Sequence, residues 1–268
     1  MSKLLIIFLV TVGWLSTFCQ TVNIKKEKLD PGYIQLKKQL VEKYKNVKAG
    51  RFSDDLPGIR HTLGTTQKKI ALTFDACGGT KGSGYDADLI AFLVKEKIPA
   101  TLFVTGSWIK KNPSIFMELC REPLFEIENH GLTHHPCTVV SESKYGIAGT
   151  GSVEASIDEI ELNARLIEFY THRKPVYYRP ATAYTDEACV LLANDLKHEI
   201  AGYSVLSGDA VANTNQDVIK NNILKKVKPG AIVILHMNHP AWNTFEALQL
   251  CIPELRKRGY EFVRLHAN

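Results

Sequence analysis

The chain of 268 residues has six cysteines but no C-x-x-C pair, so neither a zinc ribbon nor a dense disulfide scaffold is indicated. It has no internal repeat, and beyond residue 50 no low-complexity tract or linker rich in proline, glycine or serine. Lysine and arginine outnumber the acidic residues by only 33 to 28, and no aromatic-and-basic signature of nucleic-acid binding accompanies them. The sequence therefore predicts one large domain that does not bind nucleic acid.

Long apolar runs are missing too, except at the N-terminus. There an early lysine precedes an uncharged apolar run from Leu4 to Phe18, followed by small or polar residues, which is the order of a secretory signal. The run is short for a membrane span. We expect a signal peptide over residues 1–19, a secreted or periplasmic product and no stable membrane insertion. A lipoprotein anchor on Cys19 is the alternative, but bulky Phe18 stands where such a signal has a small residue.

Residues 20–60 form a predicted basic helical extension ahead of a main domain over residues 61–268. Eight lysines lie between positions 25 and 48, and apolar residues recur among them at helical spacing. This pattern predicts an amphipathic helix packed on the main domain with a solvated basic face. Attraction of that face to an anionic envelope polymer is the alternative.

The main domain alternates strand-like and helix-like segments. Apolar or β-branched runs occur at 69–75, 99–106, 125–130, 175–180, 199–205, 230–236 and 260–265, with helical patterns between most of them. This alternation predicts an α/β fold with a mostly parallel sheet. Seven strands with outer helices indicate a distorted (β/α) barrel.

Polar, mostly titratable residues stand where these predicted strands end. They are Asp75, His130 with His134 four residues on, Arg179, Asp209 and His236. Because parallel strands present their carboxyl ends on one face, these side chains are expected to meet at one active site. The four-residue spacing of His130 and His134 suits a divalent metal, and Asp75 on the neighbouring wall favours that interpretation.

From about residue 68 onward, the chain resembles the polysaccharide deacetylases of carbohydrate esterase family four. The resemblance rests on five ordered motifs: TFDACGG, HGLTH, YYRPATAY, SVLSGDA and ILH. It implies a distorted barrel and a metal-dependent hydrolase that removes acetyl groups. His130 and His134 would bind the metal, with Zn²⁺ expected, and Asp75 would be the general base. Arg179 would orient Asp75, and His236, supported by Asp209, would protonate the leaving group.

The first motif departs from the family pattern. Ala76 stands where the family has a second aspartate that binds the metal. Three outcomes stay open: weaker binding by the histidine pair with water in the gap, a substitute ligand, or an empty site. Cys77 and Asp86 are the candidate substitutes, although Ser83-x-x-Asp86 also fits a helix capping box. A histidine pair with open positions is the outcome we expect. Gly131 also replaces a serine or threonine of the second motif.

The expected substrate is an N-acetylated or O-acetylated cell-envelope polysaccharide such as peptidoglycan. One alternative is a carbohydrate-binding protein of the same fold that has lost catalysis. Another is a hydrolase of a small or cyclic amide. The presence of Asp75, Arg179 and His236 favours the enzyme, because a protein that only binds sugar would not need them.

Overall fold

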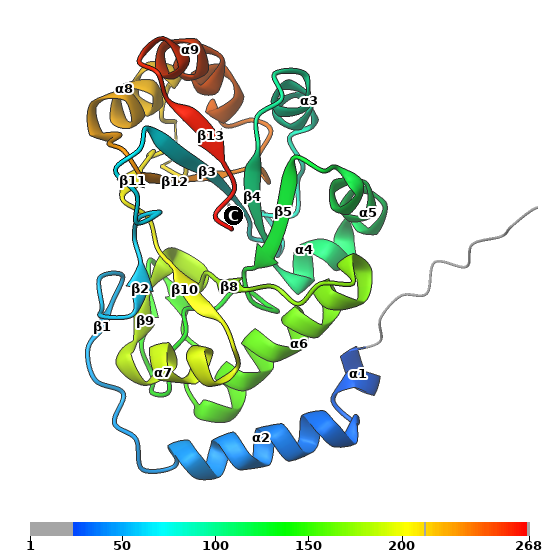
Figure 1. Ribbon diagram of the computed structural model, residues 1–268. Coiled ribbons are helices and arrows are strands. Elements are labelled where there is room, and N and C mark those ends of the chain that lie inside the picture. Colours follow the sequence, from blue (N-terminus) through cyan, green and yellow to red (C-terminus); the bar gives the residue numbers. More distant parts are fainter. Residues whose placement is uncertain (1–23, 212, 267–268) are drawn as a thin grey trace, which may run out of the picture.

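The computed structural model describes residues 24–211 and 213–266, so the predicted signal segment 1–19 lies outside the described residues. Strands and helices alternate along the chain (Figure 1). The helices are α1 (Ile24–Glu27), α2 (Pro31–Tyr44), α3 (Ala87–Lys95), α4 (Gly106–Lys111), α5 (Pro113–Arg121), α6 (Val153–Thr171), η1 (Ala181–Ala183), α7 (Glu187–Asp195), α8 (Gln216–Lys226) and α9 (Thr244–Lys257). The strands are β1 (Phe52–Ser53), β2 (Ile59–Arg60), β3 (Lys69–Ala76), β4 (Ala100–Val104), β5 (Phe125–Asn129), β6 (Ser143–Lys144), β7 (Ile147–Ala148), β8 (Tyr177–Tyr178), β9 (Thr185–Asp186), β10 (Glu199–Ala201), β11 (Val205–Leu206), β12 (Ile232–His236) and β13 (Glu261–Val263).

Within the described residues, nine strands form one sheet in the order β11-β12-β3-β4-β5-β8-β10-β2, with β13 also paired to β3. All of these pairs are parallel, and the sheet curls into a half-barrel with helices around its outside (Figure 1). The predicted α/β barrel is confirmed, and each of the seven predicted strand segments contributes to this sheet. The strand β2 completes the sheet from outside the predicted segments, and β11 begins at the last residue of the predicted segment 199–205.

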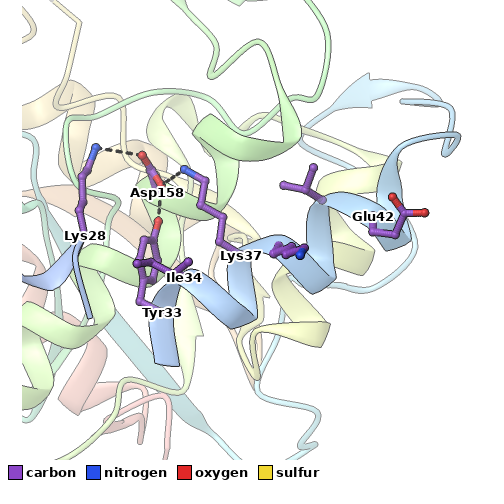
Figure 2. Close-up of a pocket in the computed structure, with 8 residues that line it drawn as sticks. Lys28, Tyr33, Ile34, Lys37, Glu42 and Asp158 are labelled. Atoms are coloured by element: carbon purple, nitrogen blue, oxygen red, sulfur yellow. Dashed lines mark hydrogen bonds and ion pairs between the residues drawn. The ribbon is translucent and has the colours of Figure 1, made fainter. Parts of the chain in front are cut away.

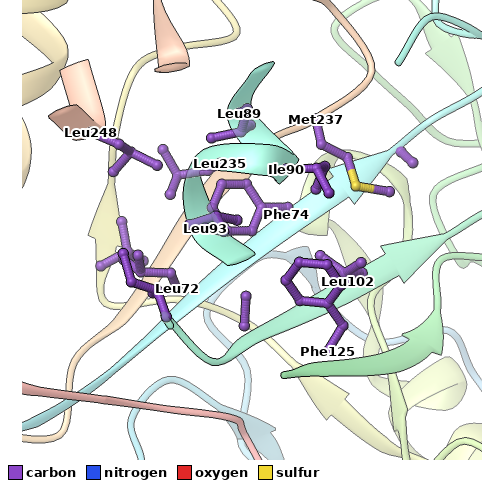
Figure 3. Close-up of a cluster of buried hydrophobic side chains, with 14 of the residues drawn as sticks. Leu72, Phe74, Leu89, Ile90, Leu93, Leu102, Phe125, Leu235, Met237 and Leu248 are labelled. Carbon is purple, nitrogen blue, oxygen red and sulfur yellow. The ribbon is translucent and has the colours of Figure 1, made fainter. Parts of the chain in front are cut away.

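Side chains of β3 alternate between the two faces of the sheet. Leu72, Phe74 and Ala76 belong to the apolar cluster under the outer helices, where Phe74 lies among side chains of α3, β12 and α9 (Figure 3). Ala71 belongs instead to the interior cluster of the half-barrel. Because side chains alternate along a strand, Asp75 shares this interior face and lies at its carboxyl end.

The N-terminal helix α2 packs against α6 on the outside of the barrel. Asp30 caps α2 by accepting a hydrogen bond from the Tyr33 amide at 2.8 Å, and Pro31 occupies the first turn. Asp158 of α6 accepts from the Tyr33 hydroxyl and pairs with Lys28 and Lys37 beside a surface cavity of about 650 Å³ (Figure 2). Two lysines of the predicted basic extension therefore form ion pairs with an acidic residue of the main domain.

Two predicted helix caps differ from the structure. Asp86 itself caps α3 by accepting from the Leu89 amide at 3.0 Å, while the Ser83 hydroxyl donates to the Gly79 carbonyl instead. By its sequence, Thr185 is a suitable cap for the following helix, but the structure has Asp186, one residue further on, as the cap of α7. Among the described residues, no helix combines the length and the apolar character needed to cross a membrane.

Candidate active site

The carboxyl ends of neighbouring strands bring the predicted site residues together. Asp75 is the next-to-last residue of β3 and His236 is the last residue of β12, and these two residues are directly paired across the sheet. His130 follows β5, Arg179 follows β8, and Asp209 follows β11. These predicted site residues therefore lie together at one edge of the sheet, as expected.

Arg179 is fully buried and spans the interior of the half-barrel. One of its terminal nitrogens donates to Asp75 Oδ1 at 2.8 Å and to Thr73 Oγ1 at 2.9 Å. The rest of the guanidinium donates to the carbonyl oxygens of Ala201 and Gly202 at 3.1 and 3.0 Å. Burial alone would raise the pKa of the Asp75 carboxyl, but the positive charge of Arg179 is the main effect that lowers this pKa below its usual value. Asp75 is therefore held as a carboxylate.

The backbone fixes the orientation of His130. Its Nδ1–H donates to the carbonyl oxygen of Arg179 at 2.7 Å, and since a carbonyl can only accept, this bond sets the tautomer. Nε2 then faces the site, 3.7 Å from Asp75 Oδ2 and 3.8 Å from Cys77 Sγ. The ring of His134 lies with its centroid 5.0 Å from that of His130. The lone pair of His130 Nε2 is thus directed at the other site residues.

Glu159 of α6 supports the loop that carries both histidines. Its carboxylate accepts from the Thr133 amide at 3.0 Å, the Thr133 hydroxyl at 2.7 Å and the His135 amide at 3.1 Å. Gly131 has a φ of +87°, and a Cβ there would lie 2.4 Å from Glu159 Oε1. The glycine that departs from the family motif is therefore required here, and a buried carboxylate holds the loop. The sequence offers one sign of this role: Glu159 is an acidic residue on the apolar side of a predicted helix, where a carboxylate needs hydrogen-bond partners.

Cys77 also faces the site, which the sequence had left open. Gly78 follows with a φ of +75°, and a Cβ there would lie 2.3 Å from Ser107 Oγ, so the tight turn depends on glycine. Burial alone would raise the pKa of the Cys77 thiol, but the imidazoles of His134 and His130 lower it well below its usual value. The two-residue spacing from Asp75 was the signal for this placement, because alternate residues share a face.

His236 and Asp209 form a second pair in the site. The Nδ1–H of His236 donates to Asp209 Oδ1 at 3.1 Å, and its backbone amide donates to Oδ2 at 2.7 Å. The hydroxyls of Ser207 and Thr244 donate to the same carboxylate at 2.9 and 3.1 Å. Burial alone would lower the pKa of His236, but the charge of Asp209 raises it well above its usual value.

One of the two aromatic side chains near the motif loops, Trp242, contacts a residue of the site. Trp242 stacks on His239 with a centroid distance of 3.8 Å and contacts the His236 ring edge-on at 5.6 Å. Tyr184 packs against Phe52 at 5.5 Å. Trp242 therefore borders the predicted proton donor directly.

Three side chains form a potential metal site. Their donor atoms lie within 4.8 Å of one another, and they belong to Cys77, His130 and His134. One thiolate with two imidazoles is a favourable ligand set for zinc and for related divalent ions. The second candidate substitute, Asp86, is occupied as the cap of α3. The residues present therefore fit a divalent metal ion.

Comparisons with known proteins agree with this geometry. A family model described as polysaccharide deacetylase matches residues 62–201. A peptidoglycan-N-acetylglucosamine deacetylase from Bacillus cereus is 28% identical over 199 residues, which cover 74% of this chain and 86% of that protein. A family 4 acetyl xylan esterase from Clostridium thermocellum, solved with a cobalt ion, is 25% identical with a TM-score of 0.60, covering 74% of this chain and 88% of that one. A family 4 pseudoenzyme from Bacillus anthracis shares the fold at 23% identity and a TM-score of 0.63, covering 86% of this chain and 79% of that one.

Proposed function

The chain belongs to the polysaccharide deacetylase family and is therefore a hydrolase, and we propose that it is a secreted, metal-dependent enzyme that removes acetyl groups from an N-acetylated cell-envelope polysaccharide. Peptidoglycan is the substrate that we favour, because the Bacillus cereus relative is a peptidoglycan deacetylase. The apolar run at the N-terminus supports export to the compartment that contains this polymer.

The proposal rests chiefly on the contact between Asp75 and Arg179 beside the two histidines. Asp75 Oδ1 is held by Arg179 at 2.8 Å, whereas Oδ2 faces His130 Nε2 at 3.7 Å. The carboxylate can therefore take a proton from a water placed between it and the histidines. Arg179 keeps the carboxylate ionised and in position, and its bonds to the barrel backbone keep Arg179 itself in place.

His130 and His134 are the histidines that would hold the metal ion, which when bound polarises the acetyl carbonyl and activates the attacking water. On the other wall, His236 donates its Nδ1–H to Asp209 and so leaves Nε2 to exchange a proton with the substrate. Protonation of the sugar nitrogen by His236 lets the carbon–nitrogen bond break, which releases acetate and a free amine. Trp242, in contact with His236, can cover one face of the sugar ring.

The test is acetate release from a panel of acetylated glycans. The purified protein is treated with a chelator and then supplied with zinc, cobalt, manganese or calcium. We expect release from N-acetylated glycans that is lost on chelation and restored by one or more of these ions. Release from O-acetylated glycans alone would change the substrate class. Glycan binding with no release under any metal would favour the non-catalytic alternative.

A further inference from the structure

We propose that Cys77 is the third protein ligand of the metal site, so that this chain replaces the missing carboxylate with a thiolate one residue further along. The inference rests on the proposed function, because it concerns the metal site of the proposed deacetylase. Its test measures the spectrum and affinity of the bound metal ion and does not depend on turnover.

The distances fit direct coordination. An ion bound tetrahedrally at about 2.3 Å from sulfur and about 2.05 Å from nitrogen separates those two donors by about 3.6 Å. Cys77 Sγ lies 3.8 Å from His130 Nε2, and the three donors, with His134, lie within 4.8 Å of one another. Small side-chain rotations are enough to close such a site.

The side chains at positions 76 and 77 lie in different surroundings. The Ala76 side chain is fully buried in the apolar cluster, together with Phe74 on the same strand face. With the orientation that the Ala76 side chain has in this chain, a carboxylate there would lie among apolar side chains. Cys77, like Asp75, lies on the side of the chain that faces the site.

The peptide group that follows Cys77 is held at both its carbonyl and its amide. The hydroxyl of Thr105 donates to the Cys77 carbonyl at 2.9 Å. The amide of Gly78 donates to the Gly82 carbonyl at 2.8 Å and closes the following turn. A ligand on a fixed backbone loses little conformational entropy when the ion binds, which favours binding.

Cobalt spectroscopy tests the assignment. The exported protein is reduced, stripped of metal with a chelator and titrated with Co²⁺. We expect a thiolate-to-cobalt charge-transfer band in the near ultraviolet and intense visible bands of a four-coordinate ion. Cys77→Ser should remove the charge-transfer band and weaken Co²⁺ binding by at least about tenfold, because loss of a direct ligand should cost no less than loss of its supporting contacts.

Two further variants control the result. Cys120→Ser changes a half-buried thiol on α5 and should keep the band. Cys77→Asp should restore much of the affinity without the band, since a carboxylate can occupy the same place. Co²⁺ bound to the native protein without a charge-transfer band would overturn the assignment. So would an acetyl group found on Cys77 in active, metal-free protein, because the thiol would then be a nucleophile.

Discussion

At the scale of single residues, the site combines one buried cation with several acceptors. Arg179 is fully buried and donates to Asp75, Thr73 and two backbone carbonyls. A buried guanidinium is stable only when its donors are paired, so Arg179 and Asp75 depend on each other. The pair therefore contributes to folding as well as to the proposed chemistry.

Asp75→Asn should abolish acetate release while the protein stays folded. The amide can still accept a hydrogen bond from Arg179 but cannot take the proton of water, so we expect a loss of about 10²–10⁴-fold in kcat. The rate is measured by acetate release and the fold by circular dichroism. Asp217→Asn, at an exposed position on α8, is the matched control and should leave the rate unchanged. Near-normal turnover of a folded Asp75→Asn protein would contradict the general-base role.

His236 and Asp209 should act as one unit. His236→Ala should reduce hydrolysis of amides more than that of esters with good leaving groups, because those esters need less protonation on departure. His236→Ala and Asp209→Asn should be strongly non-additive in kcat, since each removes the same hydrogen bond. Rates of both single variants and the double variant on an amide and an ester measure this. Additive effects would separate Asp209 from the role of His236.

Ala76→Asp should destabilise the protein rather than improve its metal binding. The family resemblance predicts tighter metal binding instead, because the family has a metal-binding aspartate at this position, but the side chain at position 76 is buried among apolar residues. An unpaired carboxylate there should cost about 3 kcal/mol of unfolding free energy, measured by urea denaturation. Ala91→Asp, at an exposed position of α3, is the control and should cost little. Tighter metal binding by a fully stable Ala76→Asp protein would show that this side chain can turn to the site.

At the scale of elements, α2 is held to α6 by a charged cluster. Asp158 pairs with Lys28, Lys37 and the Tyr33 hydroxyl, and Lys43 pairs with Asp195 of α7. The basic charge of the predicted extension is therefore partly used in packing. This favours a structural role for α2 over attraction to an anionic polymer.

Asp158→Ala should loosen α2 without changing the barrel. The variant leaves Tyr33 and two lysines without their acceptor, at a cost of about 1–3 kcal/mol for this contact. Amide hydrogen exchange in Pro31–Tyr44 should become faster, while exchange in β3 and acetate release stay unchanged. Asp217→Ala on α8 serves as the exposed control. Unchanged exchange in α2 would show that its apolar contacts alone hold it.

The local sequence predicts that a helix is present but not which residue caps it. The sequence predicts α3 and α7, but each begins with an aspartate one or more residues beyond the expected cap. Serine, threonine and aspartate all cap helices well, so adjacent candidates cannot be ranked locally. The tertiary position of the first turn decides between them, as for Asp86, whose amide donates to the Met237 carbonyl.

At the scale of the whole molecule, His198 should make global stability sensitive to acid. This side chain, between α7 and β10, is almost fully buried, and burial together with the charge of Lys174 lowers its pKa to about 3. The unfolded chain binds a proton near pH 6.5 and the folded protein does not until about pH 3. Stability from this group is therefore present above pH 6.5 and lost as the pH falls.

His198→Gln should flatten that dependence. The native protein should lose about 1.4 kcal/mol of unfolding free energy per pH unit from this group between pH 6 and 4, and the variant should not. Urea denaturation at several pH values measures the slope, which is informative even if glutamine lowers the absolute stability. His172→Asn, at the exposed end of α6, should keep the native slope. Equal slopes for the native protein and His198→Gln would remove His198 from the acid response.

The α/β barrel and the strand-end residues of the site can be predicted from the local sequence patterns. Alternation of strand and helix patterns predicts parallel strands, and parallel strands necessarily gather Asp75, Arg179 and His236 at one edge. Alternation along β3 places Ala76 opposite Asp75 and favours Cys77 on the side of Asp75, but the three-dimensional structure was needed to show that Cys77, just past the strand, faces His130. The direction of a side chain just past a strand depends on the turn that follows, and Gly78 and Thr105 set that turn through contacts between separate segments. The local sequence also could not predict that Glu159 holds the histidine loop, because these contacts join α6 to a loop distant in sequence.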